Sequence, residues 1–188
     1  MNLVSNEMGI AMRESLPPAT RYFTSTLLLF LIVVGPLAAQ DFSRNNWYFG
    51  NSNQGIRFSR SDNSASLISN SANTGVGGSA VATDPVNGNL LFYSDGVNVY
   101  DITHAAMPNG TGLTGNPAGN QSVAVAQVPG STTQYYVFTN SASGTTGGSI
   151  AYSIVDISAS GNETFPTPPI GNVTSKNNVI AGLPKRSE

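Results

Sequence analysis

Two segments of the chain, Ser79–Asp101 and Ser122–Asp156, resemble two copies of one β unit. Each has a strand that begins near a serine, a turn that contains proline and glycine, an aromatic-rich second strand and a third strand that ends in aspartate. Ser79 aligns with Ser122 and Tyr93 with Phe138, which gives a repeat of about 40–45 residues, the period of β-propeller blades. The repeat therefore predicts an all-β fold, a partial propeller of about two blades plus part of a third.

Short runs of Val, Ile, Leu, Phe and Tyr between turn residues predict the strands. Asn87-Gly88 has the residues of a tight hairpin turn, and Pro129-Gly130 has those of a type II turn. The segment Ile102–Asn120 is rich in Gly, Pro and Asn and is predicted to be a long loop. Strands are predicted at 79–83, 90–94, 97–100, 122–127, 134–139 and 150–155, with shorter ones at 46–50, 56–58 and 65–68.

The N-terminal part has the features of a secretory signal peptide. The apolar run Leu27–Val34 follows two arginines and precedes the small residues of Gly35–Ala39. A transmembrane helix is the alternative, but a bilayer span needs about 20 apolar residues, and Pro36 and Gln40 end this run earlier. We therefore expect cleavage after Ala39 and no membrane span afterwards. The translation start is left open among Met1, Met8 and Met12.

Charge and cysteine content exclude several classes of protein. Eight Lys and Arg against ten Asp and Glu give a net charge of −2 at pH 7, which argues against nucleic acid as a partner. The chain has no cysteine, so it can form neither a disulfide framework nor a thiolate metal site. The predicted organisation is a signal peptide (1–39), N-terminal strands (40–78), a first blade-like repeat with its long loop (79–120), a second repeat (121–160), and a tail rich in Pro and Asn that leads into a missing blade (161–188).

Four segments resemble one bacterial family in order and spacing: Asn46–Gly50, Gly88–Gly96, Met107–Gly112 and Tyr152–Asp156. The family is the N-terminal propeller-like region of large secreted Bacteroidetes cell-surface proteins, which often carry gliding-motility-associated or sorting C-terminal domains. The likeness spans residues 45–180. It implies a WD40-like or YVTN-like propeller at the cell surface, and it implies no catalytic residues.

Two features match catalytic or nucleotide-binding motifs by their letters alone. Gly110–Gly115 fits G-x-G-x-x-G, but no helix is predicted after it, whereas the dinucleotide fingerprint lies between a strand and a helix. His104 is the only histidine, and a Ser-His-Asp site would need a nucleophile and a carboxylate such as Asp101 beside it. One histidine without cysteine offers too few ligands for zinc. We interpret both features as parts of loops.

Loop oxygens and aromatic side chains are the remaining candidates. Asp84, Asn87 and Asn89, or Asp95 with Asp101, have oxygens that calcium could take, but they lack the EF-hand spacing and turn capping explains them too. The strand aromatics would either fill the core, which we favour, or stack on a sugar: Trp47, Tyr48, Phe49, Tyr135, Tyr136 and Phe138. No pair of carboxylates suited to glycoside hydrolysis is marked among the acids Asp41, Asp62, Asp84, Asp95, Asp101, Asp156, Glu163 and Glu188.

The sequence predicts a secreted or cell-surface binding or scaffold module that is not an enzyme and serves in adhesion or gliding. We assign no catalytic, cofactor-binding or metal-ligating residue and expect no cofactor. The expected partner is a protein or a glycan. The alternative is a fragment of a propeller-type hydrolase that acts on carbohydrates and whose catalytic blades lie elsewhere. In that case Asp95, Asp101 and His104 are the residues of this chain whose replacement should abolish turnover.

Overall fold

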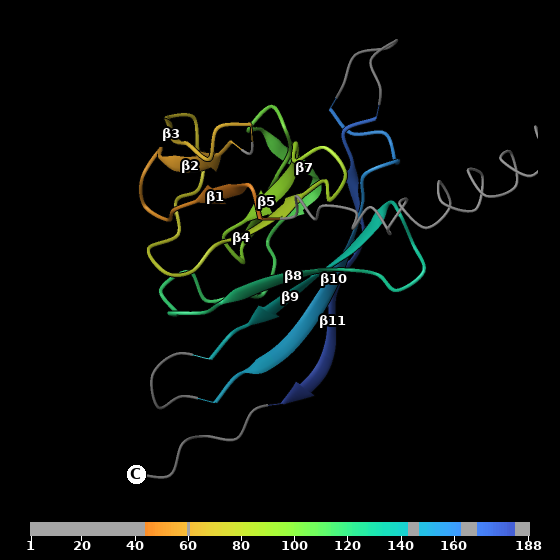
Figure 1. Cartoon of the computed structure of the whole chain (residues 1–188). Helices are drawn as coiled ribbons and strands as arrows, with labels where there is room; N and C mark the ends of the chain where they lie inside the picture. Colours follow the sequence, from red (N-terminus) through yellow and green to blue (C-terminus); the bar gives the residue numbers. More distant parts are fainter. Residues whose placement is uncertain (1–43, 60, 143–146, 163–168, 183–188) are drawn as a thin grey trace, which may run out of the picture. The chain divides into compact units, whose positions relative to one another are not determined.

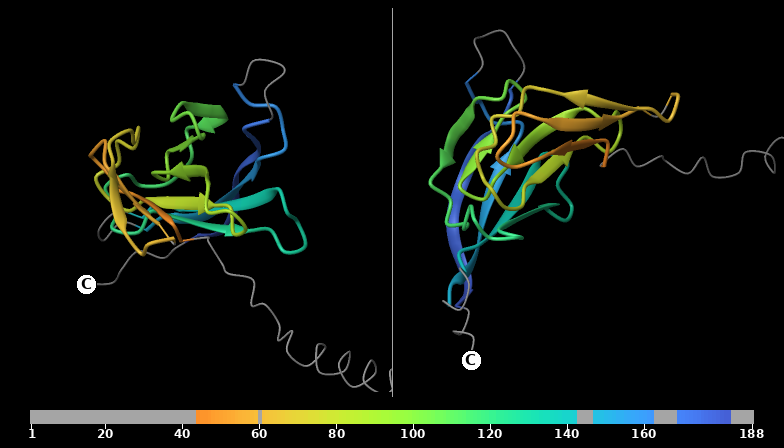
Figure 2. Two further views of the ribbon diagram at one scale, coloured as in Figure 1. Left: turned by 45° about the horizontal axis from the view of Figure 1, so that its top comes forward. Right: turned by 90° about the vertical axis from the view of Figure 1, so that its left-hand side faces the viewer.

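The computed structural model describes residues 44–59, 61–142, 147–162 and 169–182, which form three antiparallel β-sheets (Figures 1 and 2). The first sheet has the order β1-β2-β3, the second β4-β5-β6-β7, and the third β8-β9-β10-β11. No helix occurs in these ranges, so the all-β prediction is confirmed. Accordingly, the described ranges contain no helix of the length and apolarity that a membrane span requires. The predicted signal peptide lies outside them.

The six strands predicted within the two repeats are all present, with ends that differ by at most one residue. The short N-terminal strands are present as well. The strands are β1 (Asn46–Tyr48), β2 (Gly55–Phe58), β3 (Ala65–Ile68), β4 (Ala80–Thr83), β5 (Leu90–Ser94), β6 (Asn98–Tyr100), β7 (Ala106–Thr111), β8 (Val123–Gln127), β9 (Gln134–Asn140), β10 (Ser149–Asp156) and β11 (Asn172–Gly182).

Two of these strands correct the sequence interpretation. β7 lies inside the segment predicted to be a long loop, and β11 lies in the tail that was expected to lack strands. Both are outermost strands of their sheets, where Pro108 of β7 needs no ladder partner on one side. β11 pairs irregularly with β10 and has Asn177 at positive φ, so it lacks the regular alternation that marks a strand in a sequence.

The second and third sheets repeat the same strand register. β4 pairs with β5 through Ala80↔Ser94, Val81↔Tyr93 and Ala82↔Phe92. β8 pairs with β9 through Ala124↔Phe138, Val125↔Val137 and Ala126↔Tyr136, so every residue lies 44 positions after its counterpart. The repeat detected in the sequence is therefore present in the backbone pairing. Its alignment was one residue off, because the counterpart of Tyr93 is Val137 and not Phe138.

Two clusters of buried side chains join the three sheets. Tyr48 of β1 packs with Leu90, Tyr93 and Tyr100 between the first and second sheets. Phe92 and Val99 pack with residues of the third sheet in the larger cluster, whose buried members are Ala82, Phe92, Val99, Met107, Leu113, Val123, Tyr135, Val137, Val155 and Val173. The first strands of the three sheets are also neighbours, since β1 contacts β4 and β4 contacts β8.

Candidate functional site

The side chain of Asp95 caps the turn between β5 and β6. Its side chain is only 1% exposed. Oδ1 accepts hydrogen bonds from the backbone N–H groups of Val97 (2.9 Å) and Asn98 (2.6 Å), and Oδ2 accepts one from the Tyr100 hydroxyl (3.2 Å). A carboxylate with this set of donors holds a hairpin turn together. This arrangement supports the turn-capping interpretation of Asp95.

Asp101 caps the next turn in the same way. Oδ1 accepts hydrogen bonds from the backbone N–H (2.7 Å) and hydroxyl (2.6 Å) of Thr103 and from the N–H of Ala105 (3.3 Å). Asp101 is fully buried, and its Oδ2 has no hydrogen-bond partner among the described residues. The oxygen that remains is thus enclosed in the protein, where a substrate has no access to it.

His104 lies at the end of this turn with a positive φ of 67°. Its Nδ1 is 3.1 Å from the hydroxyl of Tyr93, so the ring is held against the aromatic cluster. Burial lowers the pKa of His104, and the negative charge of Asp101 opposes this shift. The imidazole is therefore paired with a tyrosine hydroxyl and favours its neutral form.

The loop oxygens considered for calcium are engaged locally. Oδ1 of Asp84 accepts from the N–H of Val86 (2.8 Å), and Oδ2 accepts from Nδ2 of Asn87 (2.6 Å). Oδ1 of Asn87 in turn accepts from the N–H of Asn89 (2.8 Å). Throughout the described ranges, no three His, Cys, Asp or Glu side chains come close enough together to hold a metal ion.

The glycine motif has the backbone of a strand end. Gly110 belongs to β7 and Gly112 follows it at φ +72°. Asn177 of β11 binds this segment, because its Nδ2 donates to the Gly112 carbonyl (3.0 Å) and its Oδ1 accepts from the Thr114 N–H (3.2 Å). No helix follows, so the segment lacks the helix N-terminus that would bind a pyrophosphate.

The strand aromatics divide into buried and exposed groups. Tyr48 and Tyr135 are buried, as predicted for core residues. The core prediction is wrong for Trp47 and Phe49, which are 51% and 42% exposed. Successive residues of a strand point to opposite faces, so Trp47 and Phe49 share the face opposite to Tyr48. The alternation was visible in the sequence, but the sequence did not reveal which face of β1 the second sheet covers.

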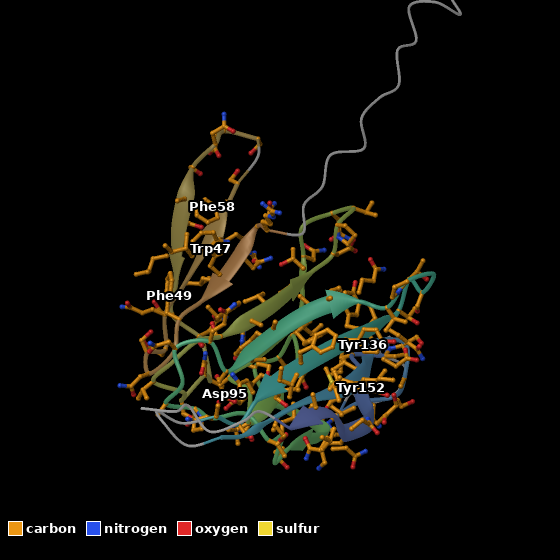
Figure 3. All side chains as sticks on the ribbon, turned by 90° about the horizontal axis from the view of Figure 1, so that it is seen from below. Trp47, Phe49, Phe58, Asp95, Tyr136 and Tyr152 are labelled. Atoms are coloured by element: carbon orange, nitrogen blue, oxygen red, sulfur yellow. The ribbon has the colours of Figure 1, made fainter. Side chains whose placement is uncertain are left out.

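A cleft of about 450 Å³ lies between β1 and β4 and brings the exposed aromatics together. Its lining includes Arg44, Trp47 and Phe49, together with the glycines Gly50, Gly77 and Gly78. Figure 3 shows Trp47, Phe49 and Phe58 on the first sheet, where the rings of Trp47 and Phe58 are 5.5 Å apart and edge to face. The cleft therefore combines aromatic rings, one guanidinium group and accessible backbone.

A second group of aromatic rings lies on the third sheet. The ring of Tyr136 is 5.5 Å from those of Phe138 and Tyr152, and it meets Tyr152 at 90° (Figure 3). All three are half-buried and stand on the face that the second sheet does not cover. These rings and the cleft are the two candidate surfaces of the described residues.

No family model, curated protein or solved structure matches the chain.

Proposed function

We propose that the protein is an exported, non-enzymatic binding module of β-propeller type that holds an acidic glycan in the cleft between β1 and β4. The propeller architecture is supported by the register shared by the second and third sheets and by the contacts of β1 with β4 and of β4 with β8. Propellers arrange successive four-stranded sheets around a central channel. The resemblance to Bacteroidetes surface proteins and the predicted signal peptide agree with a role outside the cell.

The exposed aromatic rings of the cleft are the reason for proposing a sugar as the ligand. Trp47 is 51% exposed and Phe49 is 42% exposed, although both are large apolar side chains. Aromatic rings of this kind provide flat apolar surfaces on which the faces of sugar rings can stack. Arg44 is exposed and lines the same cleft, where its planar guanidinium group can bind a carboxylate or sulfate bidentately. A glycan that carries acidic groups satisfies both features.

The positions of the candidate catalytic groups favour binding over hydrolysis. Asp95 and Asp101 are buried and accept hydrogen bonds from their own turns. Neither lines the cleft between β1 and β4. Glycoside hydrolysis would require two carboxyl groups on opposite sides of the scissile bond. The supporting observation is that these acids have a turn-capping role in their present positions.

Tryptophan fluorescence tests the proposal directly, because Trp47 is the only tryptophan of the chain. Titration of the purified protein with oligogalacturonate should change this fluorescence saturably, and a neutral maltooligosaccharide of equal length should bind about tenfold more weakly. Phe49→Ala and Arg44→Gln should each weaken binding. Lys176→Gln removes the same charge outside the cleft and should bind as the unmodified protein does.

Two outcomes would contradict the proposal. Equal binding of the acidic and neutral oligosaccharides, or none, would remove the acidic glycan as ligand. Release of reducing ends that is lost in Asp95→Asn or Asp101→Asn would instead show a hydrolase. Export is tested separately by N-terminal sequencing of protein recovered from the culture medium, which should begin at Gln40.

A further inference from the structure

The contact between the second and third sheets defines one way in which sheets of this chain pack. Ala82 and Phe92 belong to the buried cluster that joins the two sheets, and Ala80 packs against it. The ring of Phe92 meets that of Tyr135 edge to face at 5.5 Å. The second sheet therefore contacts the third through two alanines of its first strand and an aromatic residue of its second strand.

The third sheet presents the same residue types on its uncovered face. The constant shift of 44 positions carries Ala80 to Ala124, Ala82 to Ala126 and Phe92 to Tyr136. Ala124 and Ala126 are exposed, and Tyr136 is half-buried. Phe138 and Tyr152 widen this surface, since they pair with each other across β9 and β10. We call Ala124, Ala126, Tyr136, Phe138 and Tyr152 the leading face.

The first sheet has an uncovered apolar face of its own. Ile56 pairs with Trp47 on one side and with Leu67 on the other, so the three side chains form a row across the sheet. Phe58 lies on the same face against Trp47. Leu67 is 65% exposed, whereas Tyr48 on the opposite face is buried against the second sheet. We call Trp47, Ile56, Phe58 and Leu67 the trailing face.

The chain thus carries both halves of a sheet-to-sheet contact. The leading face is on the third sheet and the trailing face is on the first, and each of these sheets uses its other face to contact the second sheet. Every side chain that defines the two faces is uncharged. Burial of such surfaces is favourable at about 25 cal/mol per Å² of apolar area.

We propose that a second copy of the chain covers these faces, with the leading face of each copy packed on the trailing face of the other. Two contacts related by a two-fold axis then close the dimer and leave neither face exposed. Two copies of three sheets each make six, which lies within the usual 4–8 sheets of a closed propeller. Trp47 belongs both to the trailing face and to the lining of the cleft, so the dimer and a ligand stacked on Trp47 exclude each other, and the dimer forms without a ligand.

Light scattering coupled to size-exclusion chromatography tests the proposal on the purified protein. We expect the mass of a dimer at about 10 μM, in the concentration range of moderately tight protein interfaces. Tyr136→Lys on the leading face and Leu67→Lys on the trailing face should each raise the dissociation constant at least tenfold. Val86→Lys is the matched control, because Val86 is 78% exposed in a turn outside both faces and should leave the mass unchanged. Near-UV circular dichroism verifies that each variant is folded.

Mixing the two face variants provides a sharper test. In a mixed pair, the copy with Leu67→Lys keeps its leading face and the copy with Tyr136→Lys keeps its trailing face. These two unmodified faces meet, so one of the two contacts is intact. The mixture should therefore form heterodimers at concentrations where each variant alone is monomeric. A monomer at 100 μM would overturn the proposal, as would a dimer that withstands both substitutions. Failure of the mixture to associate would also overturn it, because an intact leading face would then not bind an intact trailing face.

Discussion

The ring of Tyr48 on β1 stacks on the ring of Tyr93 on β5, with centroids 4.4 Å apart and planes only 7° from parallel. Tyr93 also stacks on Tyr100 at 5.1 Å. These rings join the first sheet to the second, together with Asn46, whose Nδ2 donates to Oγ1 of Thr83 and to the carbonyl of Gly88. Burial raises the pKa of Tyr93 to about 12, so its hydroxyl stays protonated over the physiological range.

The stack predicts that Tyr48→Ala destabilises the protein strongly. Tyr48 is 3% exposed, and removal of a buried aromatic ring costs about 3–5 kcal/mol. Tyr48→Phe keeps the ring and should cost less than about 1 kcal/mol. Urea denaturation followed by near-UV circular dichroism gives both free energies of unfolding. Similar values for the two variants would show that the ring does not join the sheets.

His104 predicts a pH dependence of stability near neutrality. Burial lowers its pKa in the folded state, so the unfolded chain binds the proton more readily. The contribution of His104 is fully present above the unfolded pKa of about 6.5 and is lost as the pH falls below it. His104→Asn should flatten the unfolding free energy between about pH 7 and 5. Asparagine suits this site because it tolerates the positive φ.

Asp156 and Asp62 affect stability in a lower pH range than His104 does, so they serve as a control for the His104 prediction. Hydrogen bonds from neighbouring serines lower the pKa of both carboxyl groups. Their contribution is present above the unfolded pKa of about 3.9 and is lost as the pH falls below it. The loss of unfolding free energy between about pH 7 and 5 should therefore remain in the Asp156→Asn variant. If it disappeared there instead of in His104→Asn, the assignment to His104 would be wrong.

The repeat was predictable because its evidence is local. Val81 and Val125 stand in equivalent strands, and a hairpin turn follows each of them within a few residues. β7 and β11 could not be predicted in this way, because pairing with β6 and β10 determines that they form strands. Met107 and Val173 show this, since both are buried by neighbouring sheets although their own segments lack a strand pattern.

The candidate site depended on tertiary contacts that the sequence does not specify. Trp47, Tyr48 and Phe49 are adjacent aromatic residues, and strand alternation separates Tyr48 from the other two. Only the position of the second sheet decides that Tyr48 is buried and the others are exposed. The acids were easier to interpret, because Asp95 and Asp101 bind donors within five positions of themselves.

A close contact between two glycines predicts a large effect of a small substitution. A Cβ on Gly115 would lie 2.4 Å from the carbonyl oxygen of Gly96, which also accepts a hydrogen bond from the Gly115 N–H. Gly115→Ala should therefore cost about 2–3 kcal/mol, since backbone atoms would have to move. Gly112→Ala is the comparison, because that site is sterically open and its positive φ costs about 1 kcal/mol. Thermal unfolding should rank Gly115→Ala as clearly less stable.

Asp101 predicts a difference between two substitutions of one side chain. Its Oδ1 accepts three hydrogen bonds in the turn, two of them from Thr103, and its Oδ2 is buried without a partner among the described residues. Asp101→Ala removes the acceptor and should cost about 1–3 kcal/mol, because buried donors lose their partner. Asp101→Asn keeps an oxygen at the Oδ1 position and removes the buried charge, so it should be the milder change. Urea denaturation at pH 7 measures both. If Asp101→Asn were as damaging as Asp101→Ala, the carboxylate charge itself would be required, and turn capping alone would not explain the residue.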